Sequence, residues 1–266
     1  MSFDLTLNGE THKIEDGKSY FFNADCMEAL KQMPDNAISL AIVDPPYGDG
    51  TGEDTEEYWD RFGMGRFAKY QKINKSHYQG NNVRKADGSW GFSSWRKDDE
   101  SDKKIINWDV APKQEYFNEL FRVSKNQIIW GGNYFWLPPT RCFLIWRKLS
   151  ISDAFSMAMC EYAWTSFNEN AKWFEYPPQS KPGDERFHPC QKPIALYEWI
   201  LSKYAKEGDT ILDTHVGSAS SLIACYRHNL NYIGFEIDAD YYDLAQQRLA
   251  IEKSQITMFD IMNENS

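Results

Sequence analysis

The chain has 266 residues, of which 42% are hydrophobic and 15% aromatic, so it can bury one large α/β core and is unlike a fully disordered chain. No apolar run is long enough to cross a bilayer and the N-terminus lacks a signal-peptide pattern, so we expect a cytoplasmic protein with no membrane partner. Five scattered cysteines without metal-ligand spacing favour a reduced protein that binds no metal.

The first part of the chain predicts a strand at 19–23, a helix at 26–33 and an apolar, buried strand at 38–43. Asp44-Pro45-Pro46-Tyr47 follows directly, and its two prolines end the strand and stiffen the turn. Open α/β sheets place their chemistry at this carboxyl end of a strand. The Asp44 carboxylate and Pro45 carbonyl can accept hydrogen bonds from an exocyclic amine, and Tyr47 can stack on a flat base. The alternative is a simple Pro-Pro turn capped by Asp44.

Residues 48–108 show no sustained period and are rich in Gly, Asn, Ser and Lys, and so long an irregular stretch indicates a function. The net charge of the chain is −10, yet nine Lys or Arg and one acid between positions 61 and 97 give this segment +8 and leave −18 elsewhere. A basic stretch on an acidic body can direct a polyanion to one face. Seven aromatic residues interleave with these cations and could stack on bases or anchor the segment to the core.

The alternating pattern resumes with a helix at 113–123 and strands at 127–130, 142–146 and 160–165, whereas 168–187 is polar and predicts a second loop. The remaining elements expected are a helix at 194–204, a strand at 210–212, a helix at 218–227, a strand at 232–235 and a helix at 239–251. Strands that alternate with helices of this length indicate a largely parallel sheet covered by helices on both faces.

Two acids at strand ends indicate a nucleoside-binding half. Asp213 ends one strand, and Gly217 and Ser218 follow where small residues let the backbone approach a ligand at a helix N-terminus. Glu236 ends the next strand, the position that suits a ribose diol. The Gly-Lys-Ser/Thr signature of a phosphate loop is missing. An ordinary structural α/β turn would give the same local pattern.

The order of three motifs decides between these interpretations. His188-Pro189-Cys190-Gln191-Lys192-Pro193 comes directly before the helix at 194–204 and the nucleoside-binding half, while Asp44-Pro45-Pro46-Tyr47 lies near the N-terminus. This order resembles the circularly permuted β class of DNA amino-methyltransferases. The resemblance spans residues 20–250 and implies a Rossmann-like methyltransferase fold with a mostly parallel seven-stranded sheet, and S-adenosylmethionine as cofactor.

The resemblance also implies roles for individual residues. Asp44, Pro45, Pro46 and Tyr47 match the catalytic motif. The positions that match cofactor-binding positions of the family are Asp25, His188, Gln191, Lys192, Asp213, His215, Gly217, Ser218 and Glu236. Asp25 matches the acid that faces the cofactor's adenine, Glu236 the ribose acid, and Lys192 a position near the methionine carboxylate; a solvated lysine at a helix start is the alternative for Lys192.

The sequence departs from the family where Asp-Pro-Phe is replaced by Asp213-Thr214-His215 and Gly-Ser-Gly by Gly217-Ser218-Ala219. His215 could stack as the phenylalanine does or act as a base, and we expect the packing role. An aspartate at the first motif position favours adenine N6 over cytosine N4 as the methylated group. RNA or protein-amide methylation and an inactive DNA-binding module are further alternatives.

Residues 1–47 and 109–266 are therefore expected to form the catalytic domain, with 48–108 as an inserted target-recognition region. The expected contacts with double-stranded DNA in this insert are Arg66, Lys69, Lys72, Lys75, Asn81, Asn82, Arg84, Lys85 and Arg96. The resemblance is also compatible with a homodimer, with a cognate restriction endonuclease in a restriction-modification system, and with a bacterial or phage origin and action at the nucleoid.

Overall fold

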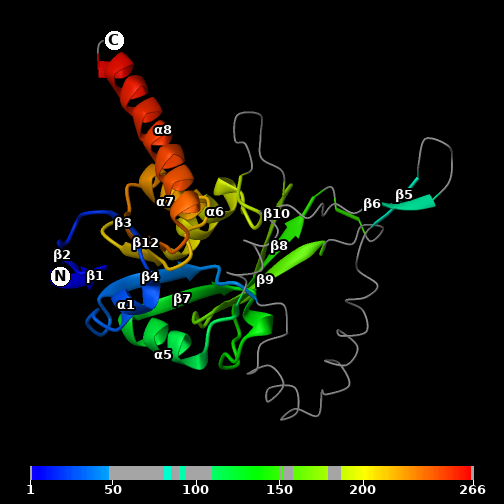
Figure 1. Cartoon of the computed structure of the whole chain (residues 1–266), viewed down its shortest axis with the longest axis horizontal. Coiled ribbons are helices and arrows are strands. Elements are labelled where there is room, and N and C mark those ends of the chain that lie inside the picture. The colour runs from blue at the N-terminus through cyan, green and yellow to red at the C-terminus, as the bar shows by residue number, and fades with distance from the viewer. Residues whose placement is uncertain are drawn as a thin grey trace. The chain divides into compact units, whose positions relative to one another are not determined.

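A computed structural model describes residues 2–47, 81–84, 90–93, 110–149, 151–152, 158–178 and 187–264. The chain divides into two compact units. The first consists of Met1–Pro45 and Lys113–Ser266, and the second of Pro46–Pro112. The first unit contains the large sheet (Figure 1). In the second unit, β5 (Asn81–Arg84) and β6 (Trp90–Ser93) pair as an antiparallel hairpin, so the stretch predicted to be irregular contains two short strands.

Eight strands form the sheet of the first unit, in the order β10-β8-β9-β7-β4-β11-β12-β3. Their bounds are β3 (Tyr20–Asn23), β4 (Ile38–Val43), β7 (Ser124–Trp130), β8 (Phe143–Lys148), β9 (Cys160–Thr165), β10 (Lys172–Tyr176), β11 (Thr210–Asp213) and β12 (Asn231–Glu236). Of these eight strands, only β9 runs antiparallel to its neighbours, and all the other pairs are parallel. The predicted mostly parallel α/β class is confirmed, with one strand more than the seven expected.

Helices cover both faces of the sheet (Figure 1). The helices α1 (Cys26–Leu30) and α5 (Gln114–Val123) lie on one face, and α6 (Ile194–Tyr204), α7 (Ser220–Arg227) and α8 (Ala239–Glu264) lie on the other. Because both faces are covered, the central strand β4 is an almost continuous run of buried apolar residues. Within the described residues, no helix is both long and apolar enough to cross a membrane.

The strand β10 corrects the prediction of a loop over 168–187. Its residues alternate between half-buried and exposed, with Phe174 and Tyr176 packed against the core, so it is a sheet edge whose apolar signal is weak. The indole nitrogen of Trp146 donates a hydrogen bond to the Tyr176 carbonyl at 3.0 Å. This contact, and parallel pairing with β8, fix the segment as a strand.

An N-terminal hairpin was also not predicted. The strands β1 (Phe3–Leu7) and β2 (Glu10–Ile14) pair antiparallel around Asn8 and Gly9, which both have positive φ (52° and 84°). Two consecutive left-handed residues make the tight turn that matches strand twist, and Asn-Gly is its strongest sequence signal. Gln32, just after α1, holds the hairpin with two hydrogen bonds to the backbone of Thr6, at 2.8 and 2.9 Å.

Candidate active site

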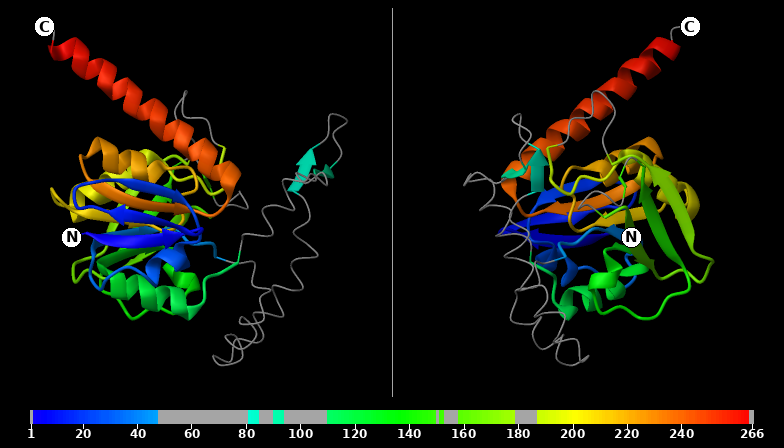
Figure 2. Two further views of the ribbon diagram at one scale, coloured as in Figure 1. Left: turned by 60° about the vertical axis from the view of Figure 1, so that its left-hand side comes forward. Right: turned by 90° about the vertical axis from the view of Figure 1, so that its right-hand side faces the viewer.

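Four acids lie at one edge of the sheet, the edge formed by the carboxyl ends of its parallel strands, because four neighbouring strands end there. The strands β4, β11, β12 and β3 are consecutive in the sheet, and Asp44, Asp213, Glu236 and Asp25 lie at or just after their carboxyl ends. Figure 2 shows these strands side by side from two directions. Burial and then the charge of Asp25 raise the pKa of the Cys26 thiol to about 12, with smaller effects from Asp213 and Glu236. The sequence-predicted acids are thus close together.

Asp213 organises the turn between β11 and α7. It is 3% exposed; one carboxylate oxygen accepts the His215 amide at 3.0 Å, and the other accepts the hydroxyl of Ser221. Burial raises the pKa of Asp213 to about 7, and the nearby carboxylates of Asp44 and Glu236 add to this effect. A cationic ligand beside Asp213 would lower this pKa and stabilise the ionised carboxylate.

Glu236 and His188 meet at Gly217. The two carboxylate oxygens of Glu236 accept the amides of Gly217 at 2.8 Å and Asp238 at 2.9 Å. Gly217 has a φ of +55°, and a Cβ there would lie 3.2 Å from the His188 ring. The left-handed conformation and the close ring both favour glycine at this position. The structure therefore brings three of the predicted cofactor residues, His188, Gly217 and Glu236, to one loop.

Thr214 and His215, which stand where the family usually has Pro and Phe, belong to a buried row of polar side chains. The hydroxyls of Tyr116 and Thr214 are 2.6 Å apart, and Thr214 Oγ1 lies 2.9 Å from His215 Nδ1. The Tyr116 and His215 rings also meet edge to face, with centroids 5.5 Å apart. Burial lowers the pKa of His215 to about 4, so its ring is neutral near pH 7. Ala219, at the position of the family's second glycine, has a φ of 61°, a left-handed conformation that glycine would adopt without strain.

The residues just before α6 are buried beside this edge. Gln191 is 6% exposed; its side-chain carbonyl accepts the Phe187 amide at 3.3 Å, while its Nε2 has no hydrogen-bond partner among the described residues. The ammonium of Lys192 contacts the Asp44 carboxylate and lies 3.1 Å from Glu161 Oε2. Lys192 is therefore a buried ion-pair partner and not a solvated lysine at a helix start.

Two further residues belong to the series of ion pairs that includes Lys192 and Asp44, and neither was predicted. Glu161 on β9 contacts Lys192 with one oxygen and Lys148 with the other, at 2.6 Å. Neither Glu161 nor Lys148 lies in a local motif, so no sequence pattern indicates them. Asp25 caps α1 by accepting the Met27 amide at 2.9 Å, a role that its position before a helix does suggest.

The sequence model of the DNA methylase family matches residues 38–247, most of the chain. The chain belongs to the DNA methylase family. It is 26% identical over 251 residues to the type II methyltransferase M.HpaI of Haemophilus parainfluenzae, covering 91% of this chain and 76% of the relative. Among solved structures, the cytosine-N4-specific PvuII DNA methyltransferase has a TM-score of 0.50 at 12% identity, covering 91% of this chain and 95% of that one. The complex of M1.HpyAVI with SAM has a TM-score of 0.47 at 18% identity, covering 86% and 98%.

In the sequence of this DNA methylase, the division between the two units falls within the predicted catalytic motif. Asp44 and Pro45 belong to the first unit, and Pro46 and Tyr47 begin the second. Of the predicted DNA contacts, Asn81, Asn82 and Arg84 lie on β5. The others, Arg66, Lys69, Lys72, Lys75, Lys85 and Arg96, lie outside the described residues.

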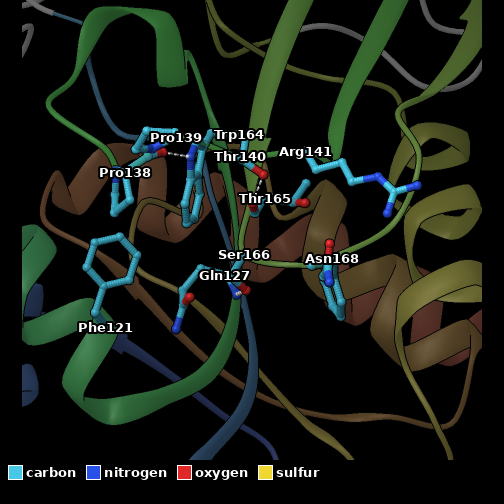
Figure 3. A pocket seen from close by; sticks show the side chains of 11 residues that line it. Phe121, Gln127, Pro138, Pro139, Thr140, Arg141, Trp164, Thr165, Ser166 and Asn168 are labelled. Carbon is cyan, nitrogen blue, oxygen red and sulfur yellow. Dashed lines mark hydrogen bonds between the residues drawn. The ribbon is translucent and has the colours of Figure 1, made fainter.

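A pocket of about 360 Å³ lies at the opposite edge of the DNA methylase sheet, where its parallel strands begin, near the start of β8 and the end of antiparallel β9 (Figure 3). Two of its polar side chains make hydrogen bonds to backbone: Trp164 Nε1 donates to the Pro138 carbonyl, and Thr140 Oγ1 to the Thr165 carbonyl, each at 2.6 Å. None of the predicted site residues that the structure describes lines this pocket. The candidate active site is therefore the edge that carries the four acids.

Proposed function

We propose that this DNA methylase transfers a methyl group from S-adenosylmethionine to the N6 amine of adenine in double-stranded DNA, after base flipping. The observation that carries the proposal is the placement of Asp44 directly after β4, the strand beside β11, which itself ends in Asp213. An acceptor for the target amine and the groups suited to the cofactor thus share one edge of the sheet.

The residues at this edge fit S-adenosylmethionine, which carries positive charge on its sulfonium and amino groups. Asp213 supplies a buried acid for a cationic group, and Glu236 an acid for the ribose diol, while Asp25 would face the adenine amine. The buried Nε2 of Gln191 is a donor in need of an acceptor, which a carboxylate would supply. When bound, S-adenosylmethionine provides an electrophilic methyl group.

The amine of adenine is a poor nucleophile because its lone pair is delocalised into the ring. Asp44 and the Pro45 carbonyl would accept its two N–H bonds and so hold the nitrogen in line for transfer. The amine loses one proton as it gains the methyl group, and Asp44 either takes this proton or only accepts the hydrogen bond while the proton passes to water. Tyr47 would stack on the base, which has to leave the duplex because its amine is buried there.

Asp44 at the first motif position supports adenine over cytosine, for which the family usually has serine. To test this, unmethylated genomic DNA is incubated with the protein and S-adenosylmethionine, then digested and examined by mass spectrometry. N6-methyladenine is the expected product. N4-methylcytosine would keep the fold and site but overturn the base assignment, and no methylated base with retained cofactor binding would favour an inactive DNA-binding module or an RNA substrate.

We also propose that residues 1–47 and 109–266 act as the catalytic domain and that 48–108 contacts the target DNA, since this segment concentrates the basic charge of an acidic chain. Action on DNA in the cytoplasm, a homodimer and a cognate restriction endonuclease are compatible with the resemblance and are part of this proposal. Sedimentation of the purified protein with and without DNA tests the dimer.

A further inference from the structure

Four charged side chains form a chain of alternating sign that ends at the proposed catalytic acid. In order they are Lys148, Glu161, Lys192 and Asp44, contributed by β8, β9, the segment before α6 and the end of β4. Lys148 Nζ lies 2.6 Å from Glu161 Oε1, and Lys192 Nζ lies 3.1 Å from Glu161 Oε2. Two cations and two carboxylates balance each other.

These four side chains are largely shielded from water, the two lysines most of all. The side chains of Lys192 and Lys148 are 4% and 9% exposed, and that of Glu161 is 22% exposed. Lys192 Nζ also lies 5.3 Å from the centre of the Trp130 ring. Charges removed from water in this way require partners, because an unpaired buried ion is strongly unfavourable. Each member therefore depends on its neighbours for both charge and position.

Electrostatics agree with this geometry. Burial by itself would lower the pKa of Lys192, but Asp44 and Glu161 together with Tyr197 raise it above its ordinary value. Burial would raise the pKa of Glu161, but Lys192 and Lys148 lower it. Glu161 Oε2 makes no hydrogen bond among the described residues. Its contact with the Lys192 ammonium is therefore an electrostatic ion pair without hydrogen-bond geometry.

We propose that Glu161 is a positioning residue that holds the Lys192 ammonium against the Asp44 carboxylate, with Lys148 fixing Glu161 from its other side. This inference rests on the proposed function of Asp44 as the acceptor for the target amine. Glu161 acts through Lys192: it sets where the ammonium lies, and the ammonium keeps Asp44 ionised and in one orientation. A small displacement of such an acceptor reduces transfer while the cofactor groups on β11 and β12 stay in place.

The test compares Glu161→Gln with Glu175→Gln. Glu175 makes an exposed ion pair with Arg147 at 2.6 Å, so the control removes the same charge from a nearby strand. At saturating DNA and cofactor, kcat of Glu161→Gln should fall by about 10²-fold, as expected for a misplaced reacting group. The KM for S-adenosylmethionine and the kcat of the control should stay near wild type. An unchanged kcat in folded Glu161→Gln would overturn the inference.

A second pair of variants decides the matter if Glu161→Gln does not fold. Lys148→Met removes the outer cation and should lower kcat, whereas Lys148→Arg keeps the charge and should restore it. Equal activity of these two variants would contradict the inference. The alkaline limit of kcat should also move to lower pH in Glu161→Gln, because Lys192 loses one of its carboxylates; a purely structural role would not move it.

A readout without catalysis separates this inference from the proposed function. The ¹H–¹⁵N signal of the Lys192 ammonium is observable near neutral pH only if buried ion pairs slow its proton exchange, and Lys192→Arg assigns it. Exchange should accelerate in Glu161→Gln and not in Glu175→Gln. A wild type that shows this effect but transfers no methyl group would refute the function and leave the ion-pair chain. If the wild type transfers the methyl group, and Glu161→Gln changes neither the proton exchange of Lys192 nor kcat, only the positioning role is refuted.

Discussion

The amide of Gly217 donates a hydrogen bond to the carboxylate of Glu236 at 2.8 Å. This bond joins the loop after β11 to the end of β12, and the second oxygen of Glu236 accepts the Asp238 amide at 2.9 Å. Because each carboxylate oxygen can accept more than one hydrogen bond, Glu236 can shape the loop and also bind a diol. Its substitution should therefore affect both stability and ligand binding.

Glu236→Gln places an amide NH₂ against one of these backbone N–H groups. The unsatisfied donor should lower the free energy of unfolding by about 1–3 kcal/mol. Calorimetry should show weaker binding of S-adenosylmethionine, by about tenfold for each 1.4 kcal/mol of binding free energy lost. Glu198→Gln, which removes a surface partner of Arg227, is the matched control. Affinity equal to wild type in a folded Glu236→Gln would mean that the cofactor does not contact Glu236.

Asp213 gives the stability a pH dependence with a defined sign. Burial raises its pKa from 3.8 to about 7 in the folded state, so its stabilising contribution is full below pH 4 and is lost as the pH rises through about 7. Asp213→Asn removes this titration. The free energy of unfolding of the variant relative to wild type should therefore increase between pH 4 and 7, as measured by urea denaturation.

The difference between the two proteins is the quantity to follow, because His215 titrates in the same range with the opposite sign. Burial lowers the pKa of His215 from 6.5 to about 4, so its contribution is present above pH 6.5 and lost as the pH falls through about 4. The wild-type curve alone sums both effects. A difference between wild type and Asp213→Asn that does not change with pH would contradict the raised pKa of Asp213.

The fold was predictable where apolar runs are long and their ends are marked. Ile38–Val43 is apolar at nearly every position and stops at Pro45, and the helix Ile194–Tyr204 begins after Pro193, so both were predicted with the bounds observed. The β1–β2 hairpin was not predicted although Asn8-Gly9 signals it, because its two strands are short and rich in polar residues. The strand β10 was not predicted because an edge strand of mixed polarity has little apolar signal.

The site was predictable only as far as its motifs. Asp44, Asp213 and Glu236 each end a strand, so a parallel sheet brings them to one edge without further information. The partners of Lys192 were not predictable: Asp44 is 148 residues away in sequence, and Glu161 lies on the one antiparallel strand of the sheet. Pairing across such a distance depends on strand order, which no local pattern encodes.

Gln191 offers a test in which stability and binding separate. Its buried Nε2 has no hydrogen-bond partner among the described residues, so Gln191→Met removes an unsatisfied donor at similar volume, together with the acceptor of the long 3.3 Å bond from the Phe187 amide. The free energy of unfolding without cofactor should change by less than about 1 kcal/mol. Affinity for S-adenosylmethionine should fall by about tenfold, or 1.4 kcal/mol, in calorimetry. A loss of stability with unchanged affinity would show that Gln191 only supports the fold.

The basic insert should determine the salt dependence of DNA binding. Reversing the charge of Lys72, Lys75, Arg84 and Lys85 removes four of its nine cations. For every phosphate that the variant no longer neutralises, the slope of log affinity against log salt should decrease in magnitude by about 0.9. Fluorescence anisotropy with a labelled duplex at several salt concentrations measures this slope. Reversal of Lys203 and Lys206, at the end of α6, is the control, and an equal slope in the insert variant would exclude the insert as the phosphate-binding surface.

Methyl transfer to DNA by wild type and Asp44→Ala tests the central claim most directly. Both proteins are incubated with radiolabelled S-adenosylmethionine and unmethylated DNA, with cofactor binding measured in parallel by calorimetry. The wild type should label the DNA, and Asp44→Ala should bind the cofactor but lose transfer, because the acceptor for the target amine is gone. Transfer by Asp44→Ala at the wild-type rate would contradict the assignment of this edge of the sheet as the active site.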